Sequence, residues 1–234
     1  IAAYETVQKD FLIVHDPTMP VVGLQIQVLA YNTKLLKPED IPETWEDIAN
    51  PRYKGVVALD DPMRAGPLSH MLVALKDYWN NDTRWASFIG GLKSLDVPVH
   101  RSTSEMFRLM VAGEYSLAMP ALLHDVLTEK EKGGPVDFVK TAPPIVYPRF
   151  SAIYANAPHP NSAKLFDEWL ISLEGQGVLE SVGRETVRKD FPSKTSVEAV
   201  FPRGIEVIAV KNPEYLANPN GWLENYVKPI WQSS

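Results

Sequence analysis

One short segment has residue types that suit the binding of an anion. In Arg101-Ser-Thr-Ser-Glu105, the hydroxyl residues Ser102, Thr103 and Ser104 stand at the start of a predicted helix, directly after Arg101. The first N–H groups of a helix have no acceptor within the helix and carry a partial positive charge, so they favour a carboxylate, phosphate or carbonate. The alternative is an ordinary N-cap beside a solvated arginine.

A second segment, Asp61-Pro-Met-Arg-Ala-Gly66, also precedes a predicted helix. Arg64 can pair with a carboxylate or phosphate through two hydrogen bonds, and Gly66 gives the turn room before the helix begins. The alternative here is a surface arginine in a glycine-permitted turn. Both segments follow predicted strands, and open α/β sheets bind ligands beyond the carboxyl ends of their strands. We therefore predict that the two segments form one site.

The elements that position these residues alternate between strand and helix, which predicts an α/β fold with a mainly parallel sheet. Each strand is a short apolar or β-branched run, and each helix has an apolar face with a recognisable start or stop. The predicted strands are Gln25–Tyr31, Val56–Leu59, Val97–His100, Tyr115–Met119 and Phe150–Ala155. The predicted helices begin near Gly66 and span Thr83–Leu92, Ser102–Ala112, Pro120–Lys132 and Asn161–Leu173.

Composition and the absence of common catalytic motifs argue against several classes of function. A formal net charge of −6 gives no general attraction to nucleic acid or to an anionic membrane. The absence of cysteine excludes disulfides, thiolate metal sites and cysteine nucleophiles, and it fits an oxidising compartment. The sequence has no GxSxG, P-loop or HExxH motif, so neither an enzyme nor a resident cofactor is indicated. No apolar run approaches the roughly 20 residues of a membrane span.

Several phrases, taken in order, resemble one family. They are Ala30-Tyr-Asn-Thr-Lys34, Pro42-Glu-Thr-Trp-Glu-Asp47, Asn50-Pro-Arg-Tyr-Lys-Gly55, Met110-Val-Ala-Gly-Glu-Tyr115, Asn156-Ala-Pro-His-Pro-Asn161 and Glu174-Gly-Gln176. Over about residues 23–194 the chain resembles the extracellular solute-binding proteins of ABC importers that are related to ferric-ion-binding periplasmic proteins.

The resemblance implies a two-lobed, periplasmic-binding-protein-like α/β fold of the type 2 class, with hinge strands between the lobes and an incomplete first lobe. Residues 1–30 and 148–202 would be the remnant of the first lobe, and residues 31–147 and 203–234 the second. The chain starts at Ile1 without a signal sequence, so we expect a processed or truncated chain. Apolar faces with Leu165, Phe166 and Trp169 would then be left to pack against another copy or the missing segment.

The resemblance also bears on the site. It implies an anion at the start of the Ser102 helix, and it places Tyr31, Tyr147 and Arg149 at the crossings between the lobes, where hinge packing is the alternative role for the tyrosines. Ferric-binding relatives coordinate iron with adjacent tyrosines, but the corresponding stretch, Met119–Asp125, has none. His124 and Asp125 are the remaining metal-ligand candidates there; the alternative is a solvated or structural pair.

The function that the resemblance implies is that of a non-enzymatic, periplasmic or otherwise extracytoplasmic binding protein. It would capture a small ligand in the cleft between the lobes and deliver it to the membrane permease of an ABC importer. The ligand would be a metal ion with a synergistic anion, or an organic anion such as a carboxylate or phosphonate. The alternatives are an enzyme on the same fold and a truncated scaffold that binds no ligand and self-associates.

Overall fold

The computed structural model describes residues 19–233, so residues 1–18 of the predicted first lobe lie outside the described part of the chain. The strands are β1 (Val21–Asn32), β2 (Val57–Asp60), β3 (Val99–His100), β4 (Leu117–Leu122), β5 (Val136–Phe138), β6 (Ile145–Phe150) and β7 (Ile208–Ala209). The longer helices are α1 (Pro67–Trp79), α2 (Asp82–Ser94), α3 (Thr103–Ala112), α4 (Leu123–Glu131), α5 (Pro160–Leu170) and α6 (Leu173–Ser181). Shorter helices are α7 (Val197–Val200), α8 (Pro213–Ala217), α9 (Pro219–Trp222) and α10 (Lys228–Trp231), with a π-turn at Leu223–Val227 and 3₁₀ turns at Pro38–Asp40, Glu46–Ala49 and Pro51–Tyr53.

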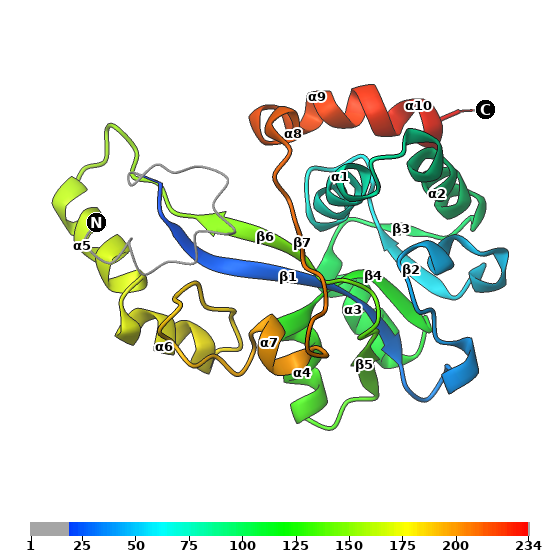
Figure 1. Cartoon of the computed structure of the whole chain (residues 1–234), viewed down its shortest axis with the longest axis horizontal. Coiled ribbons are helices and arrows are strands. Elements are labelled where there is room, and N and C mark those ends of the chain that lie inside the picture. The colour runs from blue at the N-terminus through cyan, green and yellow to red at the C-terminus, as the bar shows by residue number, and fades with distance from the viewer. Residues whose placement is uncertain (1–18, 234) are drawn as a thin grey trace.

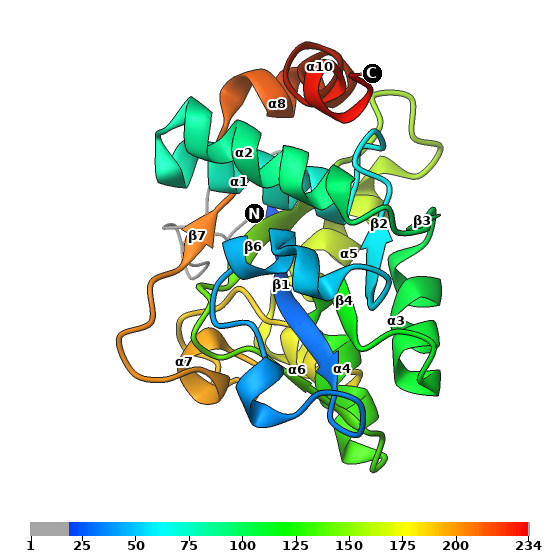
Figure 2. The same ribbon diagram turned by 90° about the vertical axis from the view of Figure 1, so that its right-hand side faces the viewer.

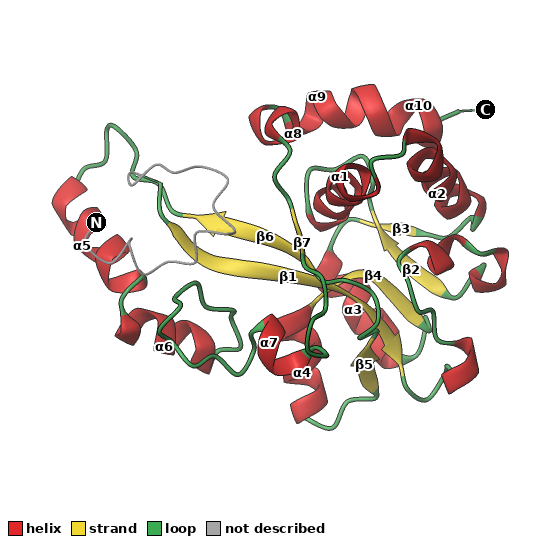
Figure 3. Cartoon of the chain, in the orientation of Figure 1, coloured by secondary structure: helices red, strands yellow, loops and turns green. Residues whose placement is uncertain are grey.

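The strands form one seven-stranded sheet with the order β3-β2-β4-β1-β6-β7, and β5 pairs with β1 (Figure 3). The pairs β2–β3, β2–β4 and β6–β7 are parallel. The long strand β1, however, is antiparallel to β4, β5 and β6. The prediction of a mainly parallel sheet was therefore wrong in this respect. Different parts of β1 pair with three strands that all run the opposite way, which makes the sheet mixed.

Alternate residues of β1 enter two different hydrophobic cores, because successive side chains of a strand point to opposite faces. Ile26, Val28 and Ala30 join a core under α3 and α4, whereas Leu29 joins the core formed by α1, α2 and the C-terminal helices. Figures 1 and 2 show α8, α9 and α10 lying over α1 and α2. The indole rings of Trp85 and Trp222 meet edge to face in that second core, with their centroids 5.9 Å apart.

The helix starts beside the predicted site form as expected. Gly66 is the N-cap of α1 and Pro67 its first residue. The side chain of Ser102 caps α3 by accepting a hydrogen bond from the N–H of Glu105, and Gly113, with φ of 94°, ends that helix in the left-handed conformation. Both helices follow strand ends, so these caps fix where the site residues begin.

Three predicted elements differ from the structure. The strand predicted at Phe150–Ala155 lies earlier, at Ile145–Phe150, and includes Pro148. Because β7 pairs with β6 only at Ile145 and Val146, the rest of β6 is an edge strand, where proline is tolerated. The helix predicted from Pro120 starts at Leu123, because β4 continues through Pro120 to Leu122. The helix predicted at Asn161–Leu173 ends earlier, at Leu170, and Leu173 already belongs to the next helix, α6, because Ser172 caps a second start.

β1 and β6 are antiparallel partners from Val21 opposite Phe150 to Gln27 opposite Ile145. Figure 1 shows both strands extending from the main body of the molecule towards the end that carries α5 and α6. There Leu165 and Phe166 are 69% and 55% exposed, so the apolar side of α5 is largely uncovered. The lobe boundaries and the self-association expected of this face remain predictions.

Candidate functional site

A pocket of about 360 Å³ lies where several strand ends and helix starts meet. Its lining contains four arginines from four separate segments, and a single carboxylate, that of Asp125. The lining residues are Gln25, Arg64, Pro67, Arg101, Ser102, Thr103, Ser104, Leu122, His124, Asp125, Arg149 and Arg184. Because guanidinium groups stay charged in proteins, the pocket is strongly positive.

Asp60, at the carboxyl end of β2, fixes one side of the pocket. Its side chain is buried, and Oδ1 accepts a hydrogen bond from Nη2 of Arg64 at 2.7 Å. Its other oxygen accepts a hydrogen bond from the hydroxyl of Thr103 at 3.2 Å. One buried carboxylate therefore ties the segment before α1 to the start of α3. Nε of Arg64 is buried and has no hydrogen-bond partner among residues 19–233.

The start of α3 supplies backbone donors to the same pocket. Ser102 uses its hydroxyl as the helix cap, 3.2 Å from the N–H of Glu105. Thr103 and Ser104 occupy the first turn and line the pocket. N–H groups at this position have no acceptor within the helix and carry the positive end of the helix dipole. An anion in the pocket can therefore be held by backbone as well as by side chains.

Arg149 lies on β6, two residues beyond Tyr147, so that both side chains point to the same face of the strand. The ring of Tyr147 stacks on that of His70, with centroids 3.8 Å apart and planes 5° from parallel. Burial, and to a lesser degree the charge of Arg149, lowers the pKa of His70 to about 4. Burial raises the pKa of Tyr147. At neutral pH this aromatic pair is uncharged, which leaves the charge of Arg149 for the pocket.

The fourth arginine, Arg184, follows α6 and contacts α4. Its Nη1 lies 2.7 Å from Nε2 of His124, whose side chain is buried in the first turn of α4. Nε2 of His124 is also 3.4 Å from Oδ1 of Asp125, and Nδ1 is 3.8 Å from Oε1 of the buried Glu185. His124 is thus surrounded by one basic and two acidic groups.

Most of the predicted site residues meet in this pocket. The structure brings together Arg64, Arg101, Ser102, Thr103, Ser104, Arg149, His124 and Asp125. Gly66 lies directly beneath Arg64, where a Cβ atom would be 3.2 Å from Nη1 of that arginine. Tyr147 lies beside the pocket, on His70.

Tyr31 does not join them. It lies near the other end of β1, opposite Leu117 and Asp137, and packs at the edge of a hydrophobic core. Tyr31 lies far from the pocket because it is six positions along the extended strand from Gln25. Hinge packing stays a prediction for Tyr31.

The residues not predicted from the sequence are Gln25, Arg184 and the supporting Asp60. Gln25 could have been found, because a polar residue within an otherwise apolar strand is a candidate for a polar contact with a ligand. Asp60 is the first polar residue after the run Val57–Leu59, four residues before Arg64. For Arg184 no spacing signal exists, because the chain returns to the pocket only after α5 and α6.

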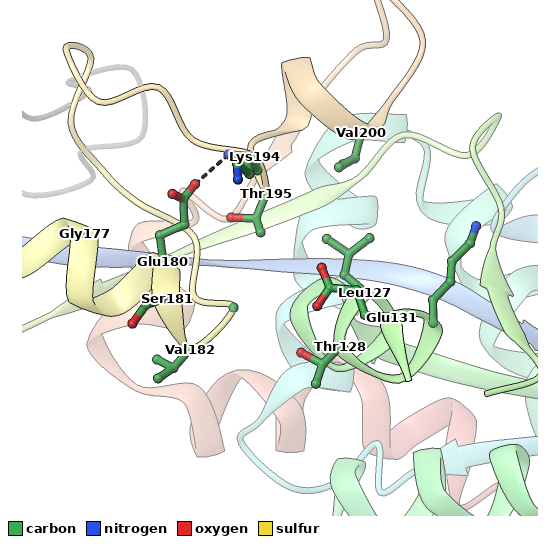
Figure 4. A pocket seen from close by; sticks show the side chains of 12 residues that line it. Leu127, Thr128, Glu131, Gly177, Glu180, Ser181, Val182, Lys194, Thr195 and Val200 are labelled. Carbon is green, nitrogen blue, oxygen red and sulfur yellow. Dashed lines mark hydrogen bonds between the residues drawn. The ribbon is translucent and has the colours of Figure 1, made fainter. Parts of the chain in front are cut away.

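A second, larger cavity of about 650 Å³ lies elsewhere, between α4, α6 and residues 194–200. Figure 4 shows Glu180 of α6 turned towards Lys194, whose backbone N–H donates a hydrogen bond to its carboxylate. The lining of this cavity contains lysines, glutamates and apolar side chains such as Leu127 and Val182. With balanced charges and an engaged carboxylate, this cavity offers less to a charged ligand than the arginine-lined pocket.

A metal-only site finds little support in the described residues. Among residues 19–233 no group of three His, Cys, Asp or Glu side chains is arranged to hold a metal ion. His124 and Asp125 are adjacent, but Nε2 of His124 already accepts from Arg184. Within the same part of the chain, no helix has the length and apolar character needed to cross a membrane.

Comparison with known proteins identifies relatives. The sequence profile of the family described as bacterial extracellular solute-binding protein matches residues 3–208. An uncharacterized protein of Haemophilus influenzae is 30% identical over 142 residues, which are 59% of this chain and 40% of that protein. The matched region therefore spans less than half of the length of that relative.

Solved structures share the fold at lower identity. The periplasmic binding protein AfuA from Actinobacillus pleuropneumoniae, with exogenous fructose-6-phosphate bound, aligns with a TM-score of 0.80 at 22% identity, over 96% of this chain and 74% of that one. The substrate binding protein of an ABC transporter from Agrobacterium tumefaciens gives 0.80 at 14% identity, over 99% and 72%. Iron-bound HitA from Pseudomonas aeruginosa gives 0.70 at 18%, over 91% and 68%. The fold is thus the mixed α/β fold of type 2 periplasmic binding proteins, matched over most of this chain and part of theirs.

Proposed function

Because the chain belongs to the bacterial extracellular solute-binding protein family, we propose that it is the ligand-binding component of an ABC importer for an organic anion with a phosphate-like head group. The family points to a binding protein rather than an enzyme, and to an extracytoplasmic location. The observation that carries the choice of ligand is the convergence of four arginines on one pocket.

The charge of the pocket supports a ligand with more than one negative charge. The four arginines come from different parts of the chain: Arg64, Arg101, Arg149 and Arg184. It is therefore the tertiary fold that brings these like charges close together. Like charges so placed repel one another, and a bound anion relieves that repulsion. Guanidinium groups match the oxygens of a phosphate through paired hydrogen bonds, and the start of α3 adds backbone donors of the kind that bind phosphate.

The rest of the pocket supports an organic rather than an inorganic ligand. Asp125 would repel a bare anion, but its carboxylate can accept hydrogen bonds from hydroxyl groups. Gln25 offers both a donor and an acceptor on the same wall. A phosphorylated polyol satisfies both requirements, and the relative solved with fructose-6-phosphate bound agrees with this choice.

The iron-binding alternative has less support. The iron-bound relative shares the fold at only 18% identity. The stretch Met119–Asp125 lacks the tyrosine pair expected of ferric-binding relatives, and His124 is engaged with Arg184. A metal ion with a synergistic anion would use the same arginines for the anion, so the test below includes it.

For the transport mechanism we propose hinge closure. Residues 19–30 and 148–202 would belong to one lobe, residues 31–147 and 203–233 to the other, and β1 and β6 would be the crossing strands. Arg149 and Arg184 would then approach the ligand from one lobe, and Arg64 and Arg101 from the other. A ligand that bridges all four favours the closed state, which the permease would recognise.

A thermal-shift screen tests this function. The purified chain is incubated with fructose 6-phosphate, glucose 6-phosphate, inorganic phosphate, citrate, or ferric ion with carbonate. We expect a sugar phosphate to raise the melting temperature of the wild type but not of Arg149→Ala. Arg108→Ala is the matched control, because it removes an exposed arginine on α3 that does not line the pocket. Stabilisation by ferric ion with carbonate alone would contradict the proposal.

A further inference from the structure

The contact between Arg184 and His124 determines where the histidine carries its proton. Nη1 of Arg184 lies 2.7 Å from Nε2 of His124. A guanidinium group has donors only, so Nε2 must accept this hydrogen bond. Neutral His124 therefore carries its hydrogen on Nδ1, and the ring nitrogen that faces the arginine is free of hydrogen.

Glu185 is placed to stabilise that tautomer. Its carboxylate is 1% exposed, and neither oxygen has a hydrogen-bond partner among residues 19–233. Oε1 lies 3.8 Å from Nδ1 of His124, which has no other partner in the same range of residues. An ionised carboxylate buried in this way is costly unless a positive group faces it. The N–H of Nδ1 is the nearest such group, because its dipole has the positive end towards Oε1.

Neighbouring contacts hold the segment of Arg184 and Glu185 in place beside His124. The N–H of Leu24 in β1 donates a hydrogen bond to the carbonyl of Glu185 at 3.3 Å. Gly183 has φ of 77°, and a Cβ atom there would be 3.1 Å from Oγ1 of Thr128 in α4, so the turn before Arg184 packs closely on that helix. The first contact fixes Glu185 against β1, and the second fixes the turn before Arg184 against α4, which carries His124.

Asp125 favours the opposite tautomer. Its Oδ1 is 3.4 Å from Nε2 of His124, so a hydrogen on Nε2 would turn to Asp125. In that case Nε2 would no longer accept from Arg184, and two donors would face each other. The two carboxylates thus compete for the position of one hydrogen, and only the arrangement favoured by Glu185 keeps Arg184 in place.

We infer that Glu185 is a positioning residue which, through the Nδ1–H tautomer of His124, holds the guanidinium group of Arg184 in the anion pocket. Glu185 does not line the pocket, so its effect on binding is indirect. The expected effect on ligand affinity rests on the proposed anion-binding function, whereas the tautomer of His124 can be measured without any ligand.

The experiment uses Glu185→Gln, which keeps the shape of the side chain but removes the charge and can donate a hydrogen bond to Nδ1. Nitrogen-15 NMR of histidine-labelled protein at pH 7.5 reports the tautomer, and the His124 signals are assigned by their loss in His124→Gln. We expect Nδ1–H in the wild type and Nε2–H in Glu185→Gln. Isothermal titration with fructose 6-phosphate should give roughly tenfold weaker binding for Glu185→Gln, as when other groups that orient a binding residue are removed.

Three controls separate positioning from a purely structural role. Glu168→Gln, an exposed change on α5, should alter neither tautomer nor affinity. Glu185→Asp keeps the charge and should retain the Nδ1–H tautomer and most of the affinity. In an Arg184→Ala background, Glu185→Gln should cause no further loss of affinity, because its effect passes through Arg184. The melting temperature of Glu185→Gln should not fall, since a buried unpaired charge is removed.

An Nε2–H tautomer in the wild type, or an equal loss of affinity from Glu185→Gln with and without Arg184, overturns the inference. If the wild type binds no fructose 6-phosphate, the proposed ligand is wrong. The NMR comparison then still decides whether Glu185 sets the tautomer of His124.

Discussion

Nη2 of Arg64 donates a hydrogen bond to Oδ1 of Asp60 over 2.7 Å, which joins a pocket arginine to the buried end of β2. The second oxygen of Asp60 accepts from Thr103, in the first turn of α3. Two helix starts that are far apart in the sequence are thereby held at one place. The geometry of the pocket on this side depends on a carboxylate that does not itself line the pocket.

Asp60→Ala should therefore lower both stability and affinity. Without Asp60, the partly exposed Arg64 can form a hydrogen bond with water instead, whereas the hydroxyl of the buried Thr103 is left without an acceptor. We therefore expect a loss of about 1–3 kcal/mol in the free energy of unfolding. Urea denaturation measures this loss. Asp61→Ala is the matched control, because the carboxylate of Asp61 accepts, among residues 19–233, only from the N–H of Met63. Equal losses in the two variants would show that Asp60 has no special part in the structure.

Ser102→Ala should cost about 0.5–2 kcal/mol of folding stability, because the capping hydrogen bond to the N–H of Glu105 is lost. The neighbouring change Ser104→Ala removes a pocket hydroxyl that does not cap α3. Its free energy of unfolding should stay within about 0.5 kcal/mol of the wild type. Chemical denaturation of both variants checks the difference, and a Ser104→Ala variant that is as unstable as Ser102→Ala would refute it.

The half-buried His70 should make the protein less stable in mild acid. Its pKa is about 4 in the folded protein, against an ordinary value of 6.5, chiefly because of burial. Below pH 6.5 the unfolded chain binds a proton that the folded chain does not, so this contribution to stability falls as the pH decreases towards 4. By pH 4 the loss reaches roughly 3 kcal/mol.

The variant His70→Phe isolates this effect, because phenylalanine can keep the stacking on Tyr147 without titrating. Urea denaturation of both proteins at pH 7, 5.5 and 4.5 gives the stability difference. We expect the wild type to lose stability relative to His70→Phe at each lower pH. A difference that is constant with pH would mean that His70 does not titrate as its burial implies.

Local signals were sufficient to predict much of the site. The cap at Ser102, the stop at Gly113 and the Gly66-Pro67 start are short-range features, and they placed two helix starts correctly. The strand β6 lies at Ile145–Phe150 rather than at the predicted Phe150–Ala155; proline usually argues against a strand, but an edge strand tolerates Pro148. The antiparallel pairing of β1 depends on partners up to about 130 residues away, which no local pattern encodes.

The same limit applies to the pocket. Arg64 and Arg101 were predicted from their neighbours in the chain and Arg149 from the family resemblance, whereas Arg184 reaches the pocket only through the packing of α6 and the following turn on α4. The tautomer of His124 depends on groups from two segments, so the sequence indicated only a candidate metal pair at His124 and Asp125. Tertiary packing shows an alternative role for that histidine as the acceptor for an arginine.

Isothermal titration of the wild-type chain with fructose 6-phosphate and with fructose shows whether the pocket selects a phosphate-like head group. We expect one-to-one binding of the phosphate ester, with fructose at least about 100-fold weaker, because two or more charge-assisted hydrogen bonds to the arginines are lost with the phosphate. Raising the salt concentration should weaken the binding of the phosphate ester and leave that of fructose unchanged. Equal affinities for the two compounds, or binding of the ester that salt does not affect, would contradict the claim that the arginine pocket selects its ligand by a phosphate-like head group.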